Sequence, residues 1–600
     1  MRYPRLGTIR TSREMIDTFK GYDCRERIGE GWFQDMTNLT SSHYPLMAPR
    51  GQRKVFEDIE DLPKVERPRE GRITGVTFNE KWGVIYAQGE NLYIWGSPNS
   101  AIGMGLGDEI KRFVQMGSYL IVLPDMAYLN LENLNDFGSL GHYVEVTEGT
   151  VTCELCDAEG NAYTDVLTAD TAPEAPEDKA LWIDTSGEDH VLKRYSATSG
   201  QWVTVVSTYV KISGLEGERG RDYFREYDGV TISGLKGAAA HLNGGAVLHY
   251  GSHRTIMIPG ILDEVYTQDC AEAPVRVERK VPVLDYVVEC GNRLWGCHYG
   301  KDRDGKMVNE IYASKLGDPR NWYCYMGIST DSWTASVGSG GSFTGAAVVG
   351  GHPVFYKYDR KHKVWPSDSG AHQITELLCQ GVGVGCDDSV AMVDGKAVYK
   401  SNIGFCIDDG DMPVEIGQNF NQKPYGSACA TVFDRKYYVS MIDEDDHWHL
   451  FVYDLDRKLW HREDDLHVLA FCGSYAVVDD GRKIIDLRGK GGLVGHGMEG
   501  PVRWMAQTGE FGLEMPNMKR LRKLILRLSM EIGAEMACYI RYDGDQEWTY
   551  LFTLLGSSLR SFSVPVRPRR CDHFQLRLEG VGDVKLWSIT KIMDEGSDKS

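Results

Sequence analysis

Leu450-Phe-Val-Tyr-Asp-Leu-Asp-Arg-Lys-Leu-Trp460 carries more fold information than any other stretch of this chain. An apolar run leads to Tyr453, a polar turn follows, and Trp460 closes the segment. This spacing suits a hairpin whose tight turn is flanked by paired rings on one sheet face. The device recurs at Tyr195–Trp202 and at Tyr358–Trp365. Its recurrence at irregular spacing predicts an all-β chain built on a degenerate β-propeller.

Composition agrees with a β-rich chain and limits its partners. The chain contains 67 Gly, 31 Tyr and 14 Trp but only 21 Pro, a mixture that favours strands and tight turns over helices. The formal net charge of −20 makes a classical nucleic-acid binder a poor interpretation, because DNA repels such a surface. A channel wall along which DNA slides without being gripped tolerates this sign, and so does a simple solubilising surface.

Two features of the sequence, its lack of long apolar segments and its scattered cysteines, predict the compartment in which the chain folds. The opening residues show no apolar signal segment, and no 18-residue apolar stretch occurs. The 14 Cys are scattered without a framework, which favours reduced thiols. We therefore expect the chain to fold in a cytoplasm.

Changes in residue composition and pattern along the chain predict several domains. Leu524, Leu526, Leu528 and Met530 alternate as one face of a sandwich strand, whereas two Ile-Ser-Gly units mark a smaller inserted domain. The expected organisation is an N-terminal arm at 1–70, first propeller part at 71–140, inserted β domain at 141–262, remaining blades at 263–490, C-terminal β-sandwich at 491–594 and disordered tail at 595–600.

Catalytic and metal signatures are weak in this sequence. We find no P-loop, no nucleophile elbow and no His-Glu-x-x-His helix. Cys153-Glu-Leu-Cys156 lacks a second ligand pair for zinc, and the acidic turn Asp443–Asp446 does not fit an EF-hand loop. We therefore predict a non-enzymatic protein with no catalytic, cofactor-binding or metal-binding residues.

Two groups of residues are candidates for contact surfaces. A basic cluster in an acidic protein predicts a salt-bridged subunit interface more than a nucleic-acid site. Gly-rich and Asp-rich loops are candidate lumen elements of an assembly. The interface candidates are Arg560, Arg567, Arg569 and Arg570, and the lumen candidates are Gly338, Gly340, Gly341, Asp408, Asp409 and Asp411.

Two phrases resemble tail proteins of short-tailed phages and related prophages. One is Arg293-Leu-Trp-Gly-Cys297 followed by Ile311-Tyr-Ala-Ser-Lys-Leu-Gly-Asp-Pro-Arg-Asn-Trp322. The other is Asp35-Met-Thr-Asn-Leu-Thr40 with Tyr44-Pro-Leu-Met-Ala-Pro-Arg50. The family that they resemble includes tail nozzle proteins and packaged-DNA stabilisation (stopper or hub) proteins. The resemblance covers mainly residues 280–330 and 30–55, and it transfers no functional residue.

The resemblance implies a structural virion protein in the phage tail. Such a subunit forms a homo-oligomeric ring, expected to be a hexamer, below the portal-adaptor ring. It contacts other tail proteins and conducts and gates packaged DNA without sequence-specific contact. The alternative is a propeller that binds or cleaves carbohydrate during receptor recognition, with exposed Trp and Tyr stacking on sugars.

Overall fold

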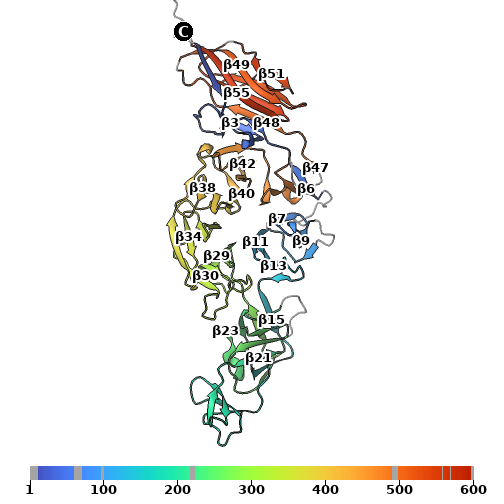
Figure 1. Cartoon of the computed structure of the whole chain (residues 1–600), viewed down its shortest axis with the longest axis vertical. Helices are drawn as coiled ribbons and strands as arrows, with labels where there is room; N and C mark the ends of the chain where they lie inside the picture. Colours follow the sequence, from blue (N-terminus) through green and yellow to red (C-terminus); the bar gives the residue numbers. More distant parts are fainter. Residues whose placement is uncertain are drawn as a thin grey trace, which may run out of the picture.

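In the computed structural model the regular secondary structure is almost all β-strand, with a few short 3-10 turns, and loops connect these elements. It describes residues 11–59, 71–95, 101–215, 223–489, 497–515, 517–556, 558–567 and 569–595. Figure 1 shows an elongated molecule, with a β-sandwich at one end, a ring of sheets in the middle and a further β domain at the other end. Among these residues no helix is long and apolar enough to cross a bilayer. The predicted fold class is confirmed.

The ring is a β-propeller whose blades are antiparallel sheets. Six blades are four-stranded meanders, namely β7–β10, β11–β14, β28–β31, β32–β35, β36–β39 and β40–β43, and β44–β46 begin a seventh. The first strand of each blade lies beside the first strand of the next, and β44 lies beside β7, so the ring is closed. These inner strands are β7 (Ile73–Asn79), β11 (Arg112–Met116), β28 (Tyr286–Glu289), β32 (Gly345–Val349), β36 (Ala391–Val393), β40 (Gly426–Phe433) and β44 (Val468–Cys472).

The segment predicted as an N-terminal arm is built into both larger domains. Its strand β6 (Lys54–Asp58) pairs with β46 (Lys483–Asp486) and completes the seventh blade. This pairing of strands from distant parts of the chain within one blade holds the ring closed. The upstream strands β1 (Thr11–Ile16) and β3 (Trp32–Thr37) join the sandwich instead.

The sandwich consists of two sheets with alternating apolar residues between them. One sheet has the order β1-β55-β49-β52 and the other the order β2-β3-β48-β54-β50-β51. Leu524, Leu526 and Leu528 of β49 (Lys519–Met530) are all buried, as their period of two predicts. The remaining strands are β2 (Gly21–Tyr22), β48 (Arg503–Thr508), β50 (Glu535–Tyr542), β51 (Thr549–Leu555), β52 (Arg560–Val564), β53 (Arg570–Cys571), β54 (Phe574–Val581) and β55 (Val584–Glu595). Of the predicted tail, only Glu595 lies within the described residues, where it ends β55.

The inserted domain runs from β15 (His142–Val146) to β27 (Val275–Arg279), beyond the predicted boundary at 262. β27 belongs here because it pairs with β15 along its whole length. The Ile-Ser-Gly units end β21 (Tyr209–Ser213) and β22 (Gly229–Ser233), which lie in the two larger sheets of the domain. A small sheet of β17 (Val166–Ala169), β18 (Leu181–Asp184), β19 (Val191–Ser196) and β20 (Gln201–Thr204) forms its far tip (Figure 1).

The aromatic hairpins behave differently at their three positions. Tyr453 pairs directly with Trp460 in the sixth blade, with ring centroids 4.9 Å apart. Tyr195 pairs with Trp202 in the same way, but in the inserted domain rather than the propeller. The prediction for Tyr358 and Trp365 is wrong. Tyr358 lies in a two-residue turn because Lys357 pairs with Arg360, so Trp365 instead faces Gln373 of the next strand.

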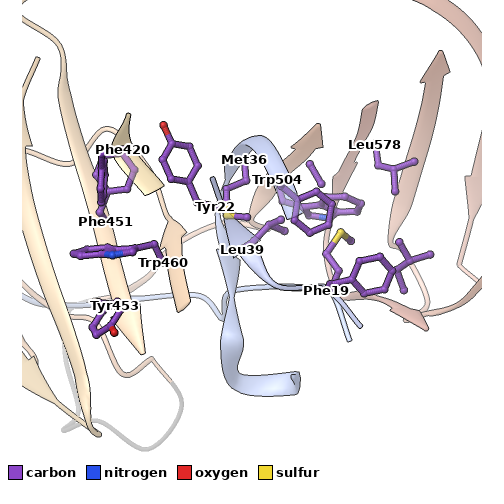
Figure 2. Packing of buried hydrophobic residues seen from close by; sticks show 14 of the residues in the cluster. Phe19, Tyr22, Met36, Leu39, Phe420, Phe451, Tyr453, Trp460, Trp504 and Leu578 are labelled. Carbon is purple, nitrogen blue, oxygen red and sulfur yellow. The ribbon is translucent and has the colours of Figure 1, made fainter. Parts of the chain in front are cut away.

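The N-terminal segment also joins the propeller and the sandwich through one apolar core. Figure 2 shows Tyr22, Met36 and Leu39 between rings of the sixth blade and residues of the sandwich. The Tyr22 ring lies 5.3 Å from that of Phe451. Met36 and Leu39 are essentially inaccessible to solvent. The two domains therefore form one packed body rather than two units on a linker.

Candidate functional site

A cavity of about 540 Å³ lies on the propeller axis. Its wall comes from the inner strands of successive blades and exposes polar and apolar surface in similar proportion, with Phe113, Val287, Cys429 and Leu469 among the apolar lining residues. Precisely placed polar groups fix the orientation of a ligand in a small-molecule site. The polar groups of this cavity therefore decide what it can do.

An ion pair crosses the axial cavity. Arg112 of the second blade donates through Nε to Asp388 Oδ1 at 2.7 Å and through Nη2 to Asp387. Both aspartates lie in a 3-10 turn (Asp387–Ser389) at the entrance to the fifth blade, so the contact spans the ring. Burial raises the pKa of Asp387 above its ordinary value, although the charge of Arg112 opposes this shift.

The chemistry available in this cavity is limited by these contacts. Two carboxylates share one guanidinium. The third carboxylate, Asp285, accepts hydrogen bonds from the Tyr299 amide at 2.9 Å and from His298 Nδ1, 2.8 Å away. A general acid must be free to give its proton to a leaving group. This arrangement is better suited to bracing opposite blades or holding a small polar ligand.

The predicted lumen loops occupy two different environments. Gly338, Gly340 and Gly341 are exposed in the connection between the third and fourth blades. Lys357 Nζ fixes this connection by donating to the carbonyl oxygen of Ser339 at 2.6 Å. The Gly-rich segment therefore links two blades.

Asp408 corrects the other loop prediction. It is fully buried, and its Oδ1 accepts a hydrogen bond from Lys361 Nζ at 2.6 Å, between the fourth and fifth blades. The Tyr356 hydroxyl donates to its Oδ2 at 2.8 Å. Asp408 ends a strand and points into the body, so it is not a lumen residue. Asp409 and Asp411 are exposed in the turn that follows.

The predicted basic cluster lies along one edge of the sandwich. All four arginines are exposed, but their surroundings differ. The Arg560 guanidinium lies 4.3 Å from the Phe562 ring centroid, and Arg569 Nη1 lies 2.7 Å from Asp545 Oδ2. Arg570 pairs in register with Arg520 of β49, and Arg567 lies in the connection between β52 and β53. The sequence analysis did not identify further cations on β49, because it considered only the apolar residues of the alternating pattern.

A buried charge network at the first domain joint was also missed. Arg53 Nη1 and Nη2 donate to Asp464 and Glu463, each at 2.6 Å, in the connection between the sixth and seventh blades. Arg50 donates through both Nη atoms to Glu499 at the entrance to the sandwich. Burial alone raises the pKa of Asp464, but Arg53 and Arg50 outweigh it and hold this pKa below its ordinary value. The network ties the N-terminal segment to both domains.

A second joint fixes the inserted domain on the third blade. Asp228 and Arg279 of the inserted domain are completely buried and pair at 2.7 Å. From the blade, Asn321 Nδ2 donates to Asp228 Oδ1 at 3.2 Å and to Asp318 Oδ2 at 2.7 Å. Asn321 Oδ1 accepts the amide of Gly229 at 2.9 Å. Asp318 and Asn321 belong to the sequence Ile311–Trp322, so this stretch builds the joint.

The candidate metal residues are accounted for by local structure. Cys153 is buried in the inserted domain, and burial raises the pKa of its thiol to about 12. Ligand atoms of Asp443, Asp445 and His447 lie within 4.8 Å of one another at a hairpin tip. Asp443 Oδ1 already accepts the amides of Asp445 and His447, and its Oδ2 lies 2.7 Å from His449 Nε2. This geometry is that of a self-capped turn.

Comparisons with known proteins give only distant structural likenesses. No family model and no curated protein matches the chain. An exo-β-1,3-galactanase of Phanerochaete chrysosporium is similar at a TM-score of 0.21 and 8% identity, over 51% of this chain and 94% of that one. PorZ, a surface component of the type-IX secretion system of Porphyromonas gingivalis, is similar at a TM-score of 0.24 and 11% identity, over 88% and 82%. A GH43 glycoside hydrolase gives a TM-score of 0.19 at 8% identity, over 52% and 97%.

Proposed function

We propose that this chain is a non-enzymatic structural subunit of a phage tail ring, placed below the portal-adaptor ring, that conducts and gates packaged DNA. One observation carries the proposal. The Asp318–Trp322 phrase, by which the chain resembles such tail proteins, forms the buried joint between propeller and inserted domain. These residues fix the orientation of the inserted domain relative to the propeller, which a subunit that transmits mechanical load requires.

The rest of the architecture supports a stiff building block. A shared apolar core and the Arg50–Arg53 network lock the sandwich to the propeller. Arg112 and its two aspartates cross the propeller axis. DNA therefore passes between copies of the chain in this proposal, not through the axis of one propeller. In this proposal the loops at Gly338–Gly341 and Asp409–Asp411 face the lumen of a homohexamer.

The direct test is the assembly state of the purified protein. Size-exclusion chromatography with light scattering, alone and with the adaptor ring of the same phage, should give a ring of defined mass. Electron microscopy of the particles should show a central opening. A protein that stays monomeric at high concentration, and also with the adaptor ring present, would overturn the proposal.

A carbohydrate-recognition propeller is the second candidate, because the axial cavity places carboxylates beside aromatic rings. Asp387 and Asp388 line the same cavity as Phe113 and Tyr286. A glycan array and a hydrolysis assay on host wall polysaccharide test this candidate. Binding or cleavage that is lost in D387N/D388N but kept in D409N would support it, and inactivity of the wild type would exclude the glycans tested.

A further inference from the structure

The outer face of the sheet β1-β55-β49-β52 combines cations with apolar side chains. Residues directly opposite each other in neighbouring strands point to the same face. Arg13 and Lys523 both pair with Ile592 of β55, from its two sides. Met15 and Ile525 flank Thr590 in the same way, and Arg527 lies opposite Ser588. The face is thus a basic surface with an apolar row through its middle.

Four cations of this face have unpaired side chains within the described part of the chain. The side chains of Arg13, Arg520, Lys523 and Arg527 make no hydrogen bond or ion pair there. The acidic residue in the same rows is Asp594, which pairs in register with Arg520 and whose carboxylate accepts the Thr11 hydroxyl at 2.7 Å. Met15 is 63% exposed in the apolar row. An exposed face of this kind is typical of a surface that binds a partner.

The charge of the whole chain identifies the partner chemistry. The chain has a formal net charge of −20, so this face is opposite in sign to the molecule that carries it. The matching acidic surface is therefore available on every other copy, particularly on the inserted domain, where acidic residues far outnumber basic ones. Two basic faces repel each other, so the contact cannot be a symmetric pairing of the same face.

We propose that this face, defined by Arg13, Met15, Arg520, Lys523, Ile525 and Arg527, docks on an acidic surface of a second copy of this chain. The contact joins unlike surfaces, so when it is not reciprocated within one pair of copies it repeats from copy to copy and either closes into a ring or grows as a filament. The self-contact follows from charge and geometry. Only its closure into a ring rests on the proposed function.

Charge reversal tests the contact. R520E/K523E/R527E changes the three β49 cations, and K236E/K301E/K306E is a matched control with three exposed lysines elsewhere. Sedimentation velocity at about 0.1 M and 1 M NaCl should show self-association of wild type and control that weakens with salt, because screening shortens from about 10 Å to about 3 Å. The face variant should dissociate at least about 100-fold more readily.

The outcomes separate this inference from the proposed function. If the face variant still forms the wild-type ring, the inference is wrong and the ring proposal stands. If wild type polymerises through this face only as an open filament and never joins the adaptor ring, the inference stands and the ring proposal fails. A wild type that stays monomeric, or that uses this face only to bind a 30-base-pair DNA duplex, overturns the inference. Circular dichroism confirms that each variant folds.

Discussion

Replacing Arg53 with methionine tests whether buried charges at the first joint keep the propeller closed. Arg53 and Glu463 are 6% and 7% exposed. R53M leaves the Glu463 carboxylate buried with only Arg50, whose Nε is 3.8 Å away. Removing one partner of a buried pair costs about 3–5 kcal/mol. Because Arg53 directly precedes β6, we expect the penalty to appear as easier opening of this closing strand.

Hydrogen exchange measured by mass spectrometry reports this opening. A change of about 1.4 kcal/mol alters an equilibrium tenfold, so the β6 amides should exchange roughly 100- to 5,000-fold faster in R53M. R435M is the matched control, because Arg435 is half exposed between Asp394 and Asp456. An exposed bridge contributes at most about 1 kcal/mol, so this control should alter exchange less than about sixfold.

The double variant R53M/E463M separates charge pairing from packing. Replacing both members of a buried pair with apolar groups of similar size is often close to neutral. We therefore expect most of the lost protection of β6 to return, since Asp464 keeps its contact with Arg50 at 3.2 Å. Exchange in R53M that matches wild type, or a double variant that exchanges faster than R53M, would refute the reasoning.

Three further predictions concern single positions. Burial lowers the pKa of His461 to about 3. Below about pH 6.5 this side chain is therefore protonated in the unfolded chain but stays neutral in the folded chain, so the free energy of unfolding falls as the pH drops. H461Q should relieve up to about 1.4 kcal/mol of this loss per pH unit, seen as a smaller shift of the urea midpoint between pH 6 and pH 4. Gly234 has φ +92°, and a Cβ there would lie 2.0 Å from the Pro274 carbonyl oxygen. G234A should therefore destabilise the inserted domain by about 1–3 kcal/mol in calorimetry, whereas G245A, with open space at Cβ, should cost less. N321L removes the hydrogen bonds of the second joint and should cost about 1–3 kcal/mol, detected as faster proteolytic release of the inserted domain.

Local patterns in the sequence predicted those elements whose partners lie nearby in the chain. Val393-Asp-Gly-Lys396 forms the two-residue turn that is typical of an Asp-Gly pair, with φ +48° at Asp394 and +73° at Gly395. The alternation in β49 likewise defined the inner face of the sandwich. Each of these patterns is contained within a dozen residues, so contacts with distant parts of the chain did not change the local structure that it predicts.

Long-range pairing was the part that local patterns could not supply. β6 pairs with a strand more than 400 residues away, and nothing in Lys54–Asp58 itself names that partner. Asp408 shows the same limit on a smaller scale. Its Asp-Asp-Gly-Asp sequence is typical of an exposed turn, and only the neighbouring blade supplies the buried Lys361 that pairs with it. The missed site residues are of this kind, because their chemistry arises between blades and domains.

The two joints share a physical logic that bears on function. Apolar surfaces between β domains would be satisfied by many relative orientations, because dispersion and hydrophobic contacts have little directionality. Asp228, Arg279 and Asn321 are buried polar groups whose donors and acceptors match in one orientation. A displacement at this joint would leave buried charge unpaired, a cost of several kcal/mol. The joint thus specifies the angle of the inserted domain more than it adds stability, which is the property that an assembly needs if every copy must present its surfaces identically.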